Sequence, residues 1–226
     1  VGNVAATNFN PFTANINTQR GKQSGWATLN RLSVGDFSGE PKVQNGNLTA
    51  HWNGSSSTHG GAGDTYGGAT STIGMSSGKW YWEIDVTEDS GNNVCMTGVQ
   101  LPSYAIVDPY GSTTDGSWTW YRQTARHNNT TTATTLDAIG NRLTMIAVDM
   151  DNGYLWFGQN GFWEKGNPGN GSSTAVYTNL KTFDTSRQTV YATTGSAGQG
   201  AIWNARYNFG QKPFKYAPPA GFQPLN

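Results

Sequence analysis

Two carboxylates on one predicted strand, and a third just beyond it, are the residues whose types and spacing could do chemistry. Glu83, Asp85 and Glu88 follow one another at short intervals in an otherwise apolar stretch. A pair of carboxyl groups about 5 to 5.5 Å apart can cleave a glycosidic bond with retention of configuration. Glu83 and Asp85 share one face of a strand, whereas Glu88 points to the other face. A β-bulge near Thr87 would be needed to complete such a pair.

The remaining metal-ligating and nucleophilic residues predict neither a metal site nor a cofactor site. The three histidines lack the short spacings of zinc ligands; they are His51, His59 and His127. Asp149 and Asp151 carry oxygens that suit calcium, but the following Asn152-Gly153 is typical of a tight turn, and we expect a hairpin there. Cys95 is the only cysteine, and its apolar neighbours predict a buried thiol.

The strand that must position the carboxylates, residues 78–86, is the predicted centre of the fold. With a period of two, one face is wholly apolar, and the other is mixed and carries the charges. The apolar face consists of Trp80, Trp82, Ile84 and Val86, and the other of Lys79, Tyr81, Glu83 and Asp85. We expect the apolar face to nucleate the core and the other face to be solvated or to face another subunit.

Short strands joined by turns are expected along the whole chain, and no segment has helical periodicity. Hairpin turns are predicted at Asn45-Gly46, Asp151-Asn152-Gly153 and Asn160-Gly161. A further turn at 89–92 is expected to pair the central strand with the next one. The predicted strands are 27–29, 42–44, 48–52, 69–75, 78–86, 94–101, 142–150, 154–157, 162–163, 189–193 and 201–209. This pattern predicts an all-β sandwich, jelly roll or barrel.

Composition limits the function classes and the number of domains. The chain has 226 residues, which suits one all-β domain. Fourteen basic residues balance fourteen acidic ones, so the sequence indicates no affinity for nucleic acid. No stretch reaches the roughly 18 apolar residues of a membrane span. We expect residues 1–28 to form an extended arm or first strand, and residues 29–226 to form the sandwich.

Aromatic residues in the irregular interval 102–136 form the candidate contact surface. The predicted binding residues are Tyr110, Trp118, Trp120, Tyr121 and, as a neighbour, Trp163. Exposed rings among amides and hydroxyls suit recognition of a glycan or a protein. The alternative is that Trp118, Trp120 and Tyr121 cap one end of the core, and the sequence favours neither interpretation.

Three blocks of sequence, in this order, resemble SPRY domains. They are 78–83, then 146–153 leading to Trp156-Phe157 and Asn160-Gly161, then 207–214 before 218–222. The resemblance covers roughly residues 70–226. It implies a concanavalin-A-like β-sandwich of two curved antiparallel sheets that acts as an interaction module without an active site.

The upstream segments 27–30 and 44–49 resemble SPRY-like modules of structural proteins in tailed bacteriophages. This resemblance implies a virion component, such as a fibre, spike or head decoration, located on an extracellular particle. Its expected partners are other virion proteins and a glycan or protein of the host surface.

Two other functions stay open at the level of sequence. The acidic stretch is similar to that of laminarinase-type glycoside hydrolases, which implies Glu83 as nucleophile, Asp85 as its helper and Glu88 as acid/base. The second alternative is a scaffold protein with no ligand.

Overall fold

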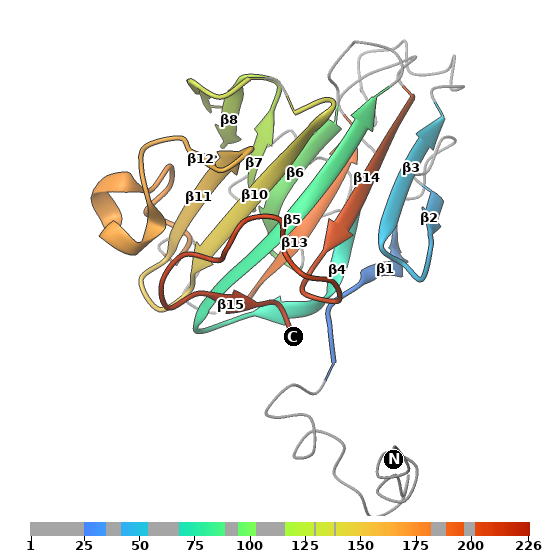
Figure 1. Cartoon of the computed structure of the whole chain (residues 1–226), viewed down its shortest axis with the longest axis horizontal. Coiled ribbons are helices and arrows are strands. Elements are labelled where there is room, and N and C mark those ends of the chain that lie inside the picture. Colours follow the sequence, from blue (N-terminus) through green and yellow to red (C-terminus); the bar gives the residue numbers. More distant parts are fainter. Residues whose placement is uncertain are drawn as a thin grey trace, which may run out of the picture.

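The computed structural model describes residues 25–34, 42–53, 68–88, 95–102, 116–128, 130–137, 139–181, 189–196 and 202–226. They form two β-sheets packed face to face (Figure 1). The seven-stranded sheet contains, in spatial order, β1 (Leu29–Val34), β4 (Gly68–Met75), β13 (Val190–Ser196), β6 (Cys95–Gln100), β7 (Ser117–Tyr121), β8 (Thr124–His127) and β9 (Thr130–Ala133). The eight-stranded sheet contains β12 (Phe162–Trp163), β11 (Tyr154–Gln159), β10 (Arg142–Asp149), β5 (Lys79–Glu88), β14 (Ile202–Asn208), β3 (Thr49–Asn53) and β2 (Lys42–Gln44), with β15 (Gln223–Pro224) beside β5.

The predicted fold class, an all-β sandwich of two antiparallel sheets, is confirmed. The named strands pair antiparallel, except that β15 runs parallel to β5. The helices in the described ranges are two single 3₁₀ turns, η1 (Pro168–Asn170) and η2 (Ser172–Thr174). None of these helices is long and apolar enough to cross a membrane.

Strand β5 is the centre of its sheet, as predicted. It pairs with β10 from Lys79 opposite Asp149 to Val86 opposite Arg142, and with β14 along its other edge. The next two strands continue from β10 as the predicted meander. The turn at Asn160-Gly161 has both residues in the left-handed region, at φ 50° and 91°, which is the conformation that a two-residue hairpin requires.

One predicted pairing is wrong, because β5 and β6 lie in opposite sheets. Strand β6 pairs with β13 and β7. Both edges of β5 are already occupied by β10 and β14, so no edge remains for β6. The chain therefore crosses from one sheet to the other after β5.

Strands β7, β8 and β9 lie in the interval that lacked a clear strand pattern. Every residue of β7 is buried, and every residue of β9 is exposed. Neither pattern shows the alternation of a half-buried strand. The alternation of Trp118 and Trp120 with polar residues was a local signal for β7, but it was interpreted as a contact surface. The wholly exposed β9 carries no such signal.

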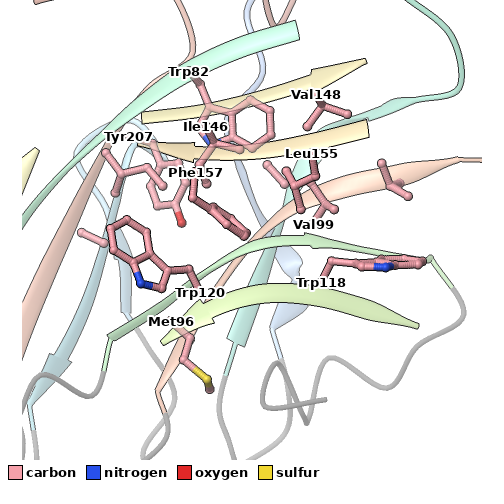
Figure 2. Close-up of a cluster of buried hydrophobic side chains, with 14 of the residues drawn as sticks. Trp82, Met96, Val99, Trp118, Trp120, Ile146, Val148, Leu155, Phe157 and Tyr207 are labelled. Atoms are coloured by element: carbon pink, nitrogen blue, oxygen red, sulfur yellow. The ribbon is translucent and has the colours of Figure 1, made fainter. Parts of the chain in front are cut away.

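The core fills the space between the two sheets. Its largest fully buried side chains include four tryptophans, Trp82, Trp118, Trp120 and Trp203. Figure 2 shows Phe157, from the opposite sheet, beside Trp120. The rings of Trp120 and Phe157 have their centroids 5.9 Å apart. Cys95 is buried, as predicted.

The outer face of β5 is also covered, so the expectation that it is solvated is wrong for its first half. Tyr81 belongs to a second apolar cluster with Met145, Ala147, Trp156 and Phe222, among others. Phe214, Tyr216 and Phe222 of this cluster come from the segment after β14, which crosses in front of β5 (Figure 1, red). The Tyr81 ring meets the ring of Phe214 edge-on, with centroids 4.9 Å apart. The C-terminal segment therefore covers a face that was expected to contact solvent or another subunit.

The end of the chain then completes one edge of β5. Strand β14 ends at Asn208, opposite Glu83, and β15 pairs with the earlier part of β5 at Trp80 and Tyr81. Beyond β15, the Leu225 carbonyl accepts a hydrogen bond of 3.0 Å from the Ala27 N–H. Residues 25–28 are the described part of the predicted arm at 1–28, and they lie beside this C-terminal strand.

Asp149 holds the hairpin between β10 and β11, in agreement with the turn interpretation of this segment. Its carboxylate accepts hydrogen bonds from the Asp151 and Asn152 backbone N–H groups and from the Asn152 side chain, and lies 3.1 Å from Lys79 Nζ. Burial alone would raise the pKa of Asp149, but the hydrogen bonds from Asn152 and Lys79 outweigh it and hold the pKa below its ordinary value of 3.8.

Replacing Trp120 by Ala is expected to lower the free energy of unfolding by about 3 to 5 kcal/mol, because a fully buried indole is lost and a cavity remains. Phe162→Ala is the control, since this ring is 75% exposed, and we expect a change of about 0.5 kcal/mol or less. Urea unfolding followed by far-UV circular dichroism measures both. Equal effects of the two substitutions would contradict the assignment of Trp120 to the core.

Asp149→Asn is expected to weaken the pH dependence of stability below the ordinary pKa of 3.8. The stabilisation from the carboxylate is present above that pKa and is lost as the pH falls through the lower pKa of the folded state. The wild-type protein should therefore exceed the variant in stability at neutral pH, and the difference should shrink in acid. The exposed Asp137, which pairs with Arg142 at 3.0 Å, is the control position. A difference that is constant from neutral to acid pH contradicts this role.

Candidate binding site

Glu83, the first residue of the predicted acidic site, is a buried structural acceptor. Its residue is only 3% exposed. Oε1 accepts hydrogen bonds from the Tyr81 hydroxyl (3.0 Å) and the Tyr216 N–H (2.8 Å), and Oε2 accepts one from the Lys215 N–H (2.9 Å). The carboxylate therefore fastens the C-terminal segment to β5.

Tyr81 is the side-chain donor to this carboxylate. Burial and, next, the adjacent negative charge of Glu83 raise the pKa of Tyr81 far above its ordinary value. The phenol therefore stays protonated and serves as a permanent donor. Glu83, the residue that the hydrolase alternative implied as nucleophile, is therefore the acceptor in a structural hydrogen bond.

Asp85, the second residue of the predicted acidic site, is engaged in an ion pair. Asp85 forms an ion pair with Arg206 at 3.0 Å, and both side chains are about half exposed. The register between β5 and β14 is regular from Glu83 to Glu88, so β5 lacks the bulge near Thr87 that a retaining pair would require. The Glu88 side chain lies outside the described part of the structure.

The expectation that Trp118 and Trp120 stand exposed is wrong, because both rings are fully buried between the sheets. The Trp118 indole N–H donates to Asn179 Oδ1 at 3.2 Å, and the ring stacks on His127 with centroids 4.6 Å apart. The apolar face of the opposite sheet packs against these rings, so their contacts are with the core. The alternative interpretation, in which they belong to the core, agrees with the structure.

The remaining predicted binding residues are not brought together. Tyr121 is 6% exposed, and the guanidinium groups of Arg122 and Arg126 each lie 5.1 Å from its ring. Trp163 packs edge-on against Tyr81 on the outer face of the other sheet, with centroids 6.2 Å apart. Tyr110 lies outside the described residues. The five predicted residues therefore do not form one surface.

A polar pocket lies on the outer face of the seven-stranded sheet, where β1, β4, β13 and β6 run side by side. Its volume is about 270 Å³. The lining residues are Asn30, Thr70, Ser71, Thr72, Gln100, Pro102 and Tyr191. Gln100 and Tyr191 are opposite each other in register, and the core residues Val99 and Ala192 form the next pair, so the first pair faces away from the core.

A β-bulge shapes this pocket. Gly74 pairs with Tyr191 and Thr70 with Thr193, so three residues of β4 oppose Ala192 alone. At this interruption of the ladder, the Ser71 hydroxyl forms hydrogen bonds with the backbone. It accepts one from the Ala192 N–H (3.1 Å) and donates one to the Ile73 carbonyl (2.8 Å). Bulges of this kind re-aim side chains and are enriched beside binding and active sites.

Gln100 is the most deeply buried polar group of the pocket, at 1% exposure. Its Oε1 accepts a hydrogen bond of 2.8 Å from the Thr193 hydroxyl, whereas its Nε2 is buried without a hydrogen-bond partner. A buried donor left without a partner costs about 1 to 3 kcal/mol. The Gln100 side chain therefore places a buried donor without a partner next to the pocket.

The pocket residues were not found from the sequence. Gln100 stands between Val99 and Leu101 in a run that was interpreted only as a strand. A polar residue at an outward-facing position of a buried strand was the available signal. The bulge at 71–73 has no comparable signature, because its residues are ordinary for a strand.

Neither a known family model nor a curated protein matches this sequence. Solved structures do match it. The SPRY domain of human HERC1 aligns with a TM-score of 0.58 and 17% identity, over 82% of this chain and 99% of that chain. The TRIM65 PSpry domain aligns with a TM-score of 0.54 and 16% identity, over 81% and 92% of the two chains.

Stonustoxin aligns with a TM-score of 0.51 and 15% identity, over 80% of this chain but only 28% of the toxin chain. At these identities the likeness concerns the fold. This chain therefore has the β-sandwich fold of SPRY domains, as the sequence resemblance implied.

Glu83→Gln is expected to lower the free energy of unfolding by about 1 to 3 kcal/mol, because an amide –NH₂ replaces one of two oxygens that accept buried N–H and O–H groups. Asp85→Asn is the matched control on the same strand face. Its exposed ion pair should contribute about 1 kcal/mol or less. Chemical denaturation of both variants tests this difference. A Glu83 variant as stable as the Asp85 variant would show that the carboxylate does not hold the C-terminal segment.

Proposed function

We propose that this chain is a non-catalytic binding module of a phage particle, and that it contacts its partner through the outer face of the seven-stranded sheet. The observation that carries this proposal is the polar pocket on the seven-stranded sheet, whose lining includes the buried amide of Gln100. On β5, Glu83 is engaged by the C-terminal segment and Asp85 by Arg206. On the other sheet, Gln100 keeps an unpartnered donor beside a pocket.

The fold supports the binding role. SPRY domains are typically protein-binding modules. Two of them align with this chain over more than nine-tenths of their own length. A sandwich with a continuous core is a rigid support for a recognition surface. The partner is therefore expected to bind a preformed surface rather than to induce one.

The particle context rests on the resemblance of segments 27–30 and 44–49 to phage structural modules. The proposed location is the virion, and the proposed partners are neighbouring virion proteins and a glycan or protein of the host surface. The balanced charge of the chain, with fourteen basic and fourteen acidic residues, supports a partner other than nucleic acid.

The first arm of the test measures hydrolysis. The purified chain is incubated with laminarin and lichenan, and the release of reducing ends is measured for the parent and for Glu83→Gln. We expect no release from either protein. Hydrolysis by the parent that disappears in the variant would overturn the non-catalytic assignment.

The second arm measures binding to cells. The fluorescently labelled chain is incubated with a panel of bacterial strains, and the bound fraction is measured by flow cytometry. We expect saturable binding to a subset of strains, with Tyr191→Ala weakening it and the distant Phe162→Ala leaving it unchanged. Absence of binding to every strain would overturn the host-surface contact and favour the scaffold alternative.

A further inference from the structure

We propose that the pocket beside Gln100 is a saccharide site that takes one neutral sugar ring. This inference rests on the proposed binding function and names the ligand class of the same surface. It is independent of the aromatic residues predicted from the sequence, because none of them lines the pocket.

The first argument is charge. The pocket is lined by two amides, three hydroxyl-bearing residues of the Ser/Thr type, a tyrosine and a proline, and none of these groups is ionised at neutral pH. An anionic ligand would lose its hydration without gaining a cationic partner. The lining therefore favours a ligand that is polar and uncharged.

The second argument is the balance of donors and acceptors. Gln100 uses Oε1 for the Thr193 hydroxyl, and Asn30 uses Oδ1 for the Leu32 N–H (3.0 Å). Asn30 therefore keeps its –NH₂ group and one oxygen lone pair for a ligand, and the Gln100 –NH₂ group lies without a partner beside the pocket. Thr72 Oγ1 accepts from the Thr28 N–H (3.0 Å), so its hydroxyl hydrogen is the part left to donate. A pocket that offers donors suits the hydroxyl and ring oxygens of a sugar.

The third argument is the aromatic wall. The Tyr191 ring lies over Gly74, where a Cβ atom would come within 2.8 Å of its Cζ. Because Gly74 has no side chain, the ring can settle onto the β4 backbone and lose little further freedom on binding. An apolar ring face beside amide and hydroxyl groups is a suitable surface for the C–H face of a sugar.

The fourth argument is size. Pockets for drug-sized ligands span about 300 to 1,000 Å³, and the pocket here, at about 270 Å³, lies just below that range. It therefore suits a single ring, either free or at the end of a longer glycan. The rest of such a glycan would extend into solvent.

The experiment observes Gln100 directly. The ¹⁵N-labelled chain is titrated with glucose, galactose, mannose, N-acetylglucosamine and N-acetylgalactosamine, and separately with inorganic phosphate. The Gln100 side-chain –NH₂ signals are assigned by their loss in Gln100→Met. We expect at least one neutral sugar to shift these signals saturably, and phosphate to leave them in place.

Variants then test the site. Tyr191→Ala should weaken binding of that sugar by about tenfold or more, whereas Tyr191→Phe, which keeps the ring, should weaken it much less. Phe162→Ala, on the opposite sheet, should bind as the parent does. Tyr191 is only half-buried, so this pair stays informative if Gln100→Met fails to fold.

Two results would overturn the saccharide assignment. One is the absence of any shift of the Gln100 signals by the neutral sugars at millimolar concentrations, and the other is a shift produced by phosphate alone. Either result combined with specific binding to cells would leave the proposed binding function standing. Sugar binding at Gln100 without any binding to cells would instead support the saccharide site and overturn the host-surface contact.

Discussion

Strand β5 has apolar or buried side chains on both of its faces, and the arrangement of the rest of the chain follows from this constraint. Trp82, Ile84 and Val86 require the opposite sheet as a cover, which the core between the sheets provides. Tyr81 and Glu83 require a second cover, and the segment after β14 provides it. A carboxylate on that face is tolerated because its oxygens receive three hydrogen bonds. Glu83, one of the residues that suggested catalysis, therefore stabilises the fold.

The sequence predicted the elements with local patterns and missed those that depend on tertiary contacts. The alternation of residues 78–86 and the Asn-Gly turns predicted the central strand and the meander correctly, because period-two patterning and turn conformation act over a few residues. The partner of β6 depends on which strand edges are free, and no local pattern encodes this. The covering of Tyr81 depends on Phe214 and Phe222, which are more than 130 residues away in the sequence.

The candidate site was less predictable than the fold for a related reason. Trp118 and Trp120 are large apolar rings in a polar neighbourhood, and their sequence is equally compatible with a core and with a recognition surface. The choice is made by strands of the opposite sheet that pack against them. Gln100 and Tyr191 lie about 90 residues apart, and only the pairing of β6 with β13 places them side by side. A pocket assembled across strands has no motif in the chain.

The hydrogen bond between Ala27 and Leu225 brings the two ends of the sandwich to one point. A domain whose entry and exit lie side by side can be inserted into a surface loop of another protein without stretching either connection. It can also be repeated along a polypeptide with each copy attached at the same corner. In either arrangement the direction in which the pocket faces is set by the position of that one attachment.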